Sequence, residues 1–161
     1  MTSMDQSISA PVRKTIDVKA APERAFSVFT AGFDSWWPRS HKLFEEGLQA
    51  AIVEGHVGGR CFQRAADGRE CDWGRVLEWE PPHRLVIAWQ LDGQWQFDPD
   101  MAHASEVEVT FTPQPGGFTR VDLEHRHFER HGAAGAQVQS GVDSPMGWGG
   151  LLEAYAAVAQ G

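Results

Sequence analysis

The sequence predicts an α+β fold in which a strongly curved antiparallel sheet of about six or seven strands holds a long C-terminal helix. Three observations lead to this prediction. Segments with strand-like alternation fill the middle of the chain, a short helical pattern precedes most of them, and the last apolar residues recur at the spacing of one helix face. Strands grouped ahead of a helix are typical of an α+β domain.

The first strand is predicted over residues 12–19, where apolar and polar side chains alternate. A short helix is then expected from Pro22, because proline suits the first helical turn and apolar residues follow at a spacing of three to four. It should end near Gly32, and helical fragments and loop are expected over residues 34–47. Trp36 and Trp37 in this segment favour a lid, a ligand wall or a partner surface.

The middle of the chain predicts an antiparallel meander. Alternating segments separated by turn residues indicate strands at residues 50–54, 60–65, 71–80, 83–91, 106–111 and 119–127. The Asp67-Gly68 pair is a strong hairpin signal. A two-residue turn there pairs position 64 with position 71, which places Cys61 and Cys71 on opposite faces of the sheet.

That register also gathers arginines and tryptophans on one face. Such a face could hold a ligand with an apolar body and an anionic head, or the arginines could lie at the sheet edge with their stems covering the tryptophans. The residues predicted to share the face are Arg60, Phe62, Arg64, Trp73, Arg75, Leu77 and Trp79.

The C-terminal part predicts an irregular glycine-rich segment followed by a helix. Residues 128–142 carry no clear period, whereas Ser144 followed by Pro145 is typical of a helix start. The closing helix is therefore expected over residues 144–160, with Asp143 and Ser144 acting in capping. Its apolar face should pack on the sheet and leave a cavity between them.

Length and composition bound the function. A chain of 161 residues fits one domain, here residues 12–161, preceded by a flexible segment at residues 1–11. Its net charge of −8 disfavours nucleic acid as a partner. Without a long apolar run or a signal-like start, no membrane association is expected and the location is predicted to be cytoplasmic. The two cysteines are too few for a disulfide framework, and they lack the paired spacing of a zinc site.

Several short strings of the chain resemble one protein superfamily. They are Ala21-Pro22-Glu23-Arg24-Ala25-Phe26, Gly58-Gly59-Arg60, Asp67-Gly68, Trp73-Gly74-Arg75-Val76, Glu80-Pro81-Pro82, residues 85–89, Thr119-Arg120-Val121 and Gly147-Trp148. Over residues 12–160 the sequence resembles the START-like, or SRPBCC, helix-grip superfamily, which shares its fold with polyketide cyclases and pollen allergens. More narrowly it resembles the bacterial branch named after the activator of the heat-shock chaperone ATPase. The resemblance implies a deep cavity for apolar molecules between the sheet and the C-terminal helix.

The predicted function is therefore binding of a small apolar or amphipathic molecule in that cavity, with no cofactor. Two other classes stay open: a cavity enzyme with cyclase- or hydrolase-like acid–base chemistry, and a co-chaperone or protein-interaction module. A homodimer is also left open. The residues predicted to line the cavity are Trp37, Trp73, Arg75, Trp89, Phe111, Val121, Leu123, His125, Trp148 and Leu152.

His125 and His127 are the weak candidates for catalysis. At positions i and i+2 of one strand, the two imidazoles are expected to share a face, where they could flank a substrate or share a metal. A metal would need a third ligand such as Glu54, His56, His131 or Asp143, and no metal site is predicted. A structural role for both histidines is favoured.

Overall fold

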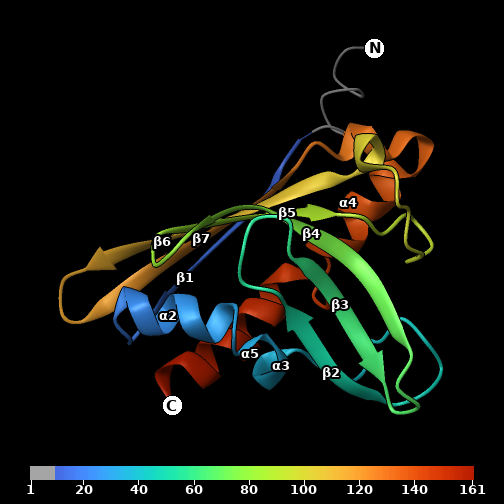
Figure 1. The fold of residues 1–161 in the computed structure, drawn as a ribbon. Coiled ribbons are helices and arrows are strands. Elements are labelled where there is room, and N and C mark those ends of the chain that lie inside the picture. The colour runs from blue at the N-terminus through green and yellow to red at the C-terminus, as the bar shows by residue number, and fades with distance from the viewer. Residues whose placement is uncertain (1–9) are drawn as a thin grey trace.

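The computed structural model describes residues 10–161, so most of the segment predicted to be flexible lies outside the described residues. Seven strands form one antiparallel sheet in the order β1-β7-β6-β5-β4-β3-β2 (Figure 1). The predicted α+β fold is confirmed. The strands are β1 Val12–Val18, β2 Leu48–Val53, β3 Arg60–Ala65, β4 Glu70–Glu80, β5 Arg84–Trp89, β6 Ser105–Gln114 and β7 Phe118–Arg126.

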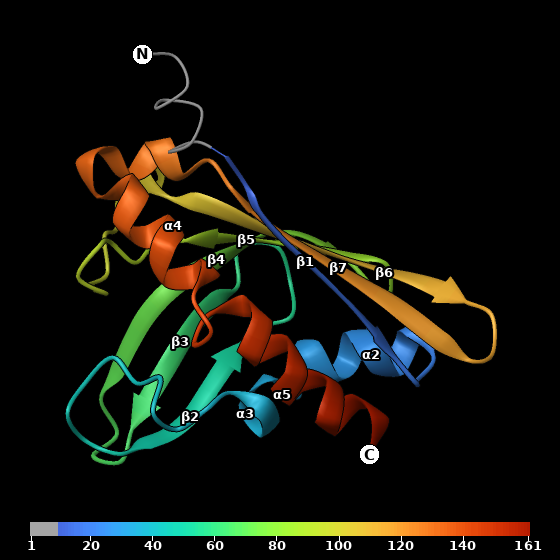
Figure 2. The ribbon, with the colours of Figure 1, turned by 180° about the vertical axis from the view of Figure 1, so that it is seen from behind.

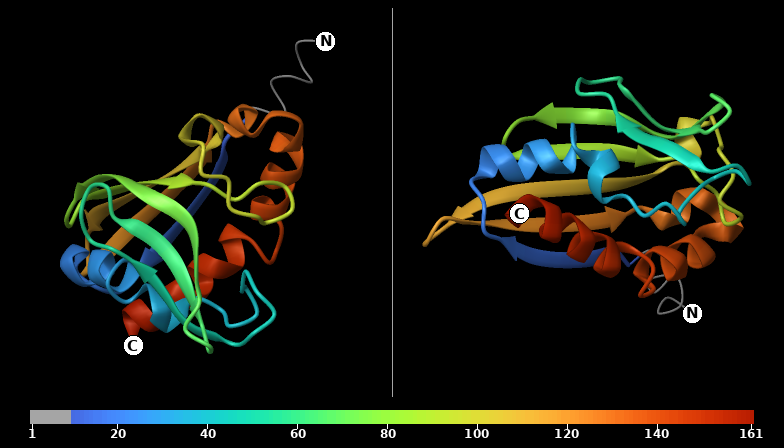
Figure 3. Two further views of the ribbon diagram at one scale, coloured as in Figure 1. Left: turned by 45° about the vertical axis from the view of Figure 1, so that its right-hand side comes forward. Right: turned by 90° about the horizontal axis from the view of Figure 1, so that it is seen from below.

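The helices gather on the concave side of the curled sheet. The C-terminal helix, residues 148–160, crosses beneath the strands and lies beside the helix of residues 22–29 (Figure 2). The view from below in Figure 3 shows the same arrangement. The α-helices are α2 Pro22–Phe29, α3 Phe33–Trp36, α4 Gly135–Asp143 and α5 Trp148–Gln160, and the 3-10 turns are η1 Met101–His103 and η2 Phe128–Ala134.

Aromatic side chains join the helices to the sheet. The ring of Phe29 on α2 lies 5.2 Å from the ring of Tyr155 on α5 and 5.9 Å from that of Phe111 on β6. The Tyr155 hydroxyl donates a hydrogen bond of 2.7 Å to the carbonyl of Ala25. Edge-to-face contacts of this kind add to the energy of simple burial. They fix α2 and α5 against one half of the sheet.

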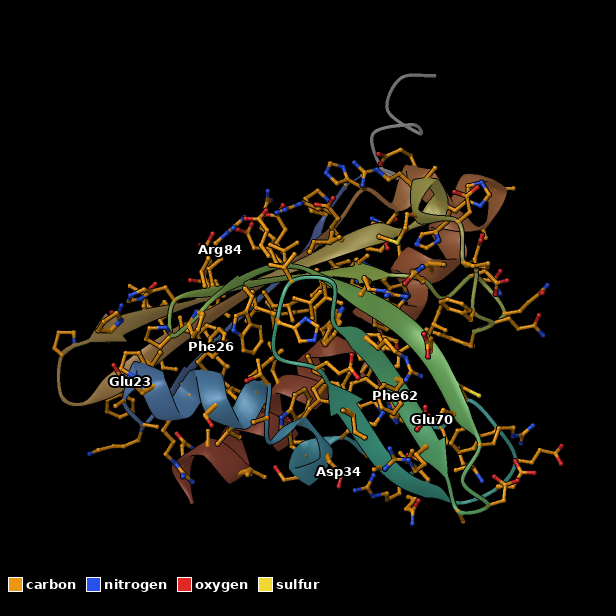
Figure 4. All side chains as sticks on the ribbon, in the orientation of Figure 1. Glu23, Phe26, Asp34, Phe62, Glu70 and Arg84 are labelled. Carbon is orange, nitrogen blue, oxygen red and sulfur yellow. The ribbon has the colours of Figure 1, made fainter. Side chains whose placement is uncertain are left out.

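The convex face of the sheet is charged. Arg84 pairs with Glu78 and Glu108, and Arg126 pairs with Glu108 at 2.6 Å. Figure 4 shows Arg84 pointing away from the helices, whereas Phe26 points into the space between α2 and the sheet. The alternation of charged and apolar residues along β6 and β7 thus separates a solvated face from the core.

The register of the β3–β4 hairpin differs from the prediction. Arg64 pairs with Glu70, and a bulge that contains Trp73 restores the pairing of Arg60 with Arg75. The bulge turns Trp73 to the concave side and leaves the arginines on the other side. The predicted common face of arginines and tryptophans is therefore wrong.

The arginines instead cover a phenylalanine. The guanidinium of Arg60 lies 4.1 Å from the ring centre of Phe62 and forms an ion pair of 2.6 Å with Asp72. The same register places Cys71 opposite Gln63. Cys71 then faces the same side as Cys61, so the prediction of opposite faces is also wrong.

The C-terminal region holds one helix that the sequence analysis did not predict. Residues of α4 were expected to be irregular, but Val138 and Val142 are buried and fix the segment as a helix despite its glycines. Ser144 lies at the C-terminal end of α4, where its hydroxyl donates to the carbonyl of Gly141 at 2.7 Å, and Asp143 pairs with Lys14 at 2.9 Å. The predicted capping role of Asp143 and Ser144 at the start of the last helix is wrong, because α5 begins at Trp148.

Among residues 10–161, none of the helices combines the length and the apolar character needed to cross a membrane.

Candidate functional site

A cavity of about 390 Å³ lies between the concave face of the sheet, residues 37–43 and the junction of α4 and α5. Volumes of this size are typical of small-molecule sites. Tryptophan is the most frequent residue type in its wall. The five indoles that line it belong to Trp37, Trp73, Trp89, Trp95 and Trp148.

Each tryptophan comes from a different element, and neighbouring rings touch. The indoles of Trp37 and Trp73 stack almost in parallel, with ring centres 6.2 Å apart and planes 6° apart. Trp89, the last residue of β5, lies 5.6 Å from Trp73 and 5.8 Å from Trp148 at the start of α5. The result is a continuous aromatic surface, which suits a flat apolar ligand.

Residues 37–43 form a lid segment over one side of the cavity. The buried side chain of Gln63 on β3 holds it twice, accepting from the backbone N–H of Leu43 at 3.0 Å and donating to the carbonyl of His41 at 2.8 Å. The indole N–H of Trp37 donates to the same carbonyl at 3.0 Å. These three bonds explain how a segment without regular structure keeps one conformation.

The mouth of the cavity carries the polar groups. A ring nitrogen of His41, Nε2, lies 2.8 Å from the carbonyl of Met146, so it must donate, and the bond spans the mouth from the lid to the α4–α5 junction. In the neutral ring Nδ1 then accepts from the hydroxyl of Ser40 at 3.3 Å. Lys42 also lines the cavity, and its ammonium group donates to the carbonyl of Glu45 at 2.6 Å.

Behind the tryptophan wall lies a buried hydrogen-bonded chain. The indole N–H of Trp148 donates to Nδ1 of His125 at 3.1 Å, and Nε2 of His125 lies 2.8 Å from the hydroxyl of Ser105. Because an indole only donates, neutral His125 must carry its proton on Nε2 and donate to Ser105. The Ser105 hydroxyl can then donate to Nε2 of His131 at 2.7 Å.

Burial fixes the charge state of this chain. His125 is fully buried, and desolvation holds its pKa well below the ordinary value, with the nearby His131 lowering it further. The pKa of His131 is also lowered, mainly by burial. His125 is therefore a neutral group that orients Trp148 and does not itself reach the cavity wall.

Four of the residues predicted to line the cavity do line it: Trp37, Trp73, Trp89 and Trp148. The others lie elsewhere. Phe111, Val121 and Leu123 are buried in the core further along β6 and β7, and Leu152 is buried beside Leu151, which does line the cavity. The guanidinium of Arg75 bonds the carbonyl of Gly58 at 3.3 Å, away from the lining residues.

The two candidate histidines do not share a face. β7 ends at Arg126, and His127 takes a left-handed backbone with φ of 69°. Its half-exposed side chain lies 3.6 Å from Glu129. The predicted pairing of His125 with His127 is wrong because the strand ends one residue too early. Within residues 10–161 no three His, Cys, Asp or Glu side chains come together in a way that could hold a metal ion.

The sequence analysis missed Gln63, His41, Trp95 and Met146 as parts of the site. Trp36 and Trp37 had marked the lid segment, and Trp37 is in the wall, while the indole of Trp36 bonds the carbonyl of Val28 in the core. Only the order of the strands in the sheet brings Gln63 beneath this segment, so no local pattern could have identified it.

A family model described as Activator of Hsp90 ATPase homolog 1-like protein matches residues 19–153. The chain belongs to this family. The resemblance predicted from short strings is thereby confirmed, and the seven-stranded sheet with its C-terminal helix agrees with the helix-grip superfamily. A search among curated proteins found no match.

Solved structures with related sequences share the fold over nearly the whole chain. An anthrahydroquino-γ-pyrone synthase, Txn09, solved as a complex with SUM, is 42% identical, with a TM-score of 0.66 over 94% of this chain and 98% of the other. CalC from Micromonospora echinospora, a self-sacrificing resistance protein, is 32% identical, with a TM-score of 0.69 over 94% of this chain and 95% of the other. A protein from Mesorhizobium loti is 24% identical, with a TM-score of 0.65 over 92% and 95% of the two chains, and shows the fold alone.

Proposed function

We propose that this protein binds a flat aromatic molecule, apolar or amphipathic, in the tryptophan-lined cavity. The observation that carries the proposal is the wall of five indoles around about 390 Å³. Apolar surface of this kind is stabilised by removal from water, and stacked rings favour planar ligands. Ser40, His41 and Lys42 at the mouth suit a polar or anionic group on the outer end of the ligand.

The similarity to Txn09 supports the same ligand class. That protein is a synthase by name, and the name describes an aromatic product. It also favours a second candidate function, conversion of the bound molecule. Ser40 and His41 at the mouth would then be the groups that move a proton. The chaperone partner, the homodimer and the cytoplasmic location stay predictions from the sequence.

Filling the cavity should weaken binding strongly. Leu151→Trp places a large ring on the cavity side of α5, whereas Ala157→Trp places the same ring on the exposed side of that helix. We expect calorimetric titration with anthracene-2-sulfonate to give an affinity for Leu151→Trp at least about ten-fold weaker than for the unaltered protein.

The Ala157→Trp variant should bind as the unaltered protein does. Equal affinities for all three proteins would show that the molecule binds outside the cavity and would refute the proposal. Recovery of a chemically altered compound after incubation would favour the enzyme, and recovery of the unchanged compound would favour binding alone.

A further inference from the structure

Two indole nitrogens in the cavity wall have no hydrogen-bond partner. Nε1 of Trp73 and Nε1 of Trp89 are both sealed from solvent, and neither finds an acceptor among residues 10–161. The two side chains are neighbours, with ring centres 5.6 Å apart, and both line the cavity. A buried N–H without an acceptor destabilises the folded protein, because the indole loses its hydrogen bond to water and forms no other.

The other buried indoles near the lid and the cavity do not share this property. The N–H of Trp36 donates to the carbonyl of Val28, that of Trp37 to the carbonyl of His41, and that of Trp148 to His125. Each of these three indoles therefore has a hydrogen-bond acceptor within the fold. The two exceptions lie side by side in the wall of the one site proposed to receive a ligand, which points to an acceptor that the ligand brings.

The surroundings narrow the chemistry of that acceptor. Among residues 10–161, no cationic side chain lines the cavity beside Trp73 and Trp89, and the one lysine in the lining, Lys42, belongs to the lid. A carboxylate would lose its hydration there without a counter-charge. The Gln63 side chain already bonds the lid through both of its polar atoms. A neutral group that only accepts, as a carbonyl oxygen does with two lone pairs, fits two donors best.

We propose that the cavity recognises an aromatic ketone or quinone whose ring oxygen accepts hydrogen bonds from the indole N–H groups of Trp73 and Trp89. This inference rests on the proposed function and names its ligand class. Because both nitrogens are sealed in this structure, binding requires each indole to turn until its N–H faces the cavity. The apolar rings of the ligand then lie along the tryptophan wall, and an outer polar group lies near Lys42.

The test compares two soluble compounds of the same outline, anthraquinone-2-sulfonate and anthracene-2-sulfonate, which differ in the ring carbonyls. We expect calorimetry to show that the quinone binds about ten-fold more tightly than the hydrocarbon. This ratio corresponds to the combined free energy of two buried hydrogen bonds. In a ¹H–¹⁵N spectrum of the unaltered protein, the indole N–H signals of Trp73 and Trp89 should move with the quinone toward the range of hydrogen-bonded protons. The hydrocarbon analogue should not cause this movement.

Substitutions assign the effect to the two residues. Trp73→Phe and Trp89→Phe each remove one N–H, and we expect each to reduce the preference for the quinone by about three-fold. Trp37→Phe is the matched control, since its N–H is already bonded to the lid. It should weaken both compounds alike and leave their ratio unchanged. The ratio is read within each variant, so a general loss of affinity does not obscure it.

The outcomes separate the two proposals. If both compounds bind with equal affinity and the two indole signals respond alike to them, the carbonyl inference is wrong while the proposed function stands. If neither compound binds to the folded protein, both are wrong. A preference for the quinone that survives in Trp73→Phe and Trp89→Phe would also overturn the inference.

Discussion

Replacing Trp148 with alanine is expected to lower the free energy of unfolding by about 3–5 kcal/mol. Trp148 is only 3% exposed and contacts Trp89, and its N–H is bonded to His125. The alanine variant loses the buried ring, enlarges the cavity and leaves Nδ1 of His125 without a donor. Urea unfolding at pH 7, followed by circular dichroism, measures the change.

Trp148→Phe separates packing from hydrogen bonding. This variant keeps an aromatic ring in the wall but removes the hydrogen-bond donor. Its loss of unfolding free energy should therefore lie between zero and that of the alanine variant. A loss below about 1 kcal/mol for Trp148→Ala would mean that this side chain does not fix α5 to the sheet.

On acidification, the protein should lose stability at pH values well above those at which carboxylates titrate. The pKa of His125 is lowered by burial. Below pH 6.5 the imidazole is therefore protonated in the unfolded chain but stays neutral in the folded protein. Stability is then lost as the pH falls from 7 to 5, by at most about 2 kcal/mol from this residue, the limit reached if the folded ring stays neutral throughout. The lowered pKa of His131 acts in the same direction, and the raised pKa of exposed His103 acts in the opposite one.

His125→Gln provides the comparison. Glutamine does not titrate, and its amide offers one acceptor for Trp148 and one donor for Ser105. The free energies of unfolding measured in urea at pH 7, 6 and 5 should therefore fall less steeply for the variant than for the unaltered protein. If the free energy of unfolding falls equally with pH in both proteins, the account of a neutral, buried His125 is contradicted.

The sequence predicted the fold well because several of its strands alternate between apolar and polar residues and its breaks fall at glycine and proline. Along β6, for example, Val107, Val109 and Phe111 are buried while the residues between them are not. It failed where tertiary packing overrides local pattern. The glycines of residues 135–143 conceal a helix that only the burial of Val138 and Val142 stabilises.

The site was harder to predict than the fold, since a small shift in pairing changes which residues share a face. The bulge at Trp73 moved that indole into the cavity wall and left Arg75 outside. The early end of β7 separated His127 from His125. Large aromatic residues were nevertheless a useful guide, because four of the tryptophans named from the sequence, Trp37, Trp73, Trp89 and Trp148, line the cavity.

The most direct test of the account is a ¹H–¹⁵N spectrum of the protein titrated with anthracene-2-sulfonate. We expect the shifts to concentrate on the backbone amides of residues 37–43 and on those of Trp89 and Trp148. A second groove beside α2, lined by Phe26 and Trp79, offers the alternative location. Shifts confined to that groove, or a spectrum that does not change, would contradict the claim that the tryptophan-lined cavity is the binding site.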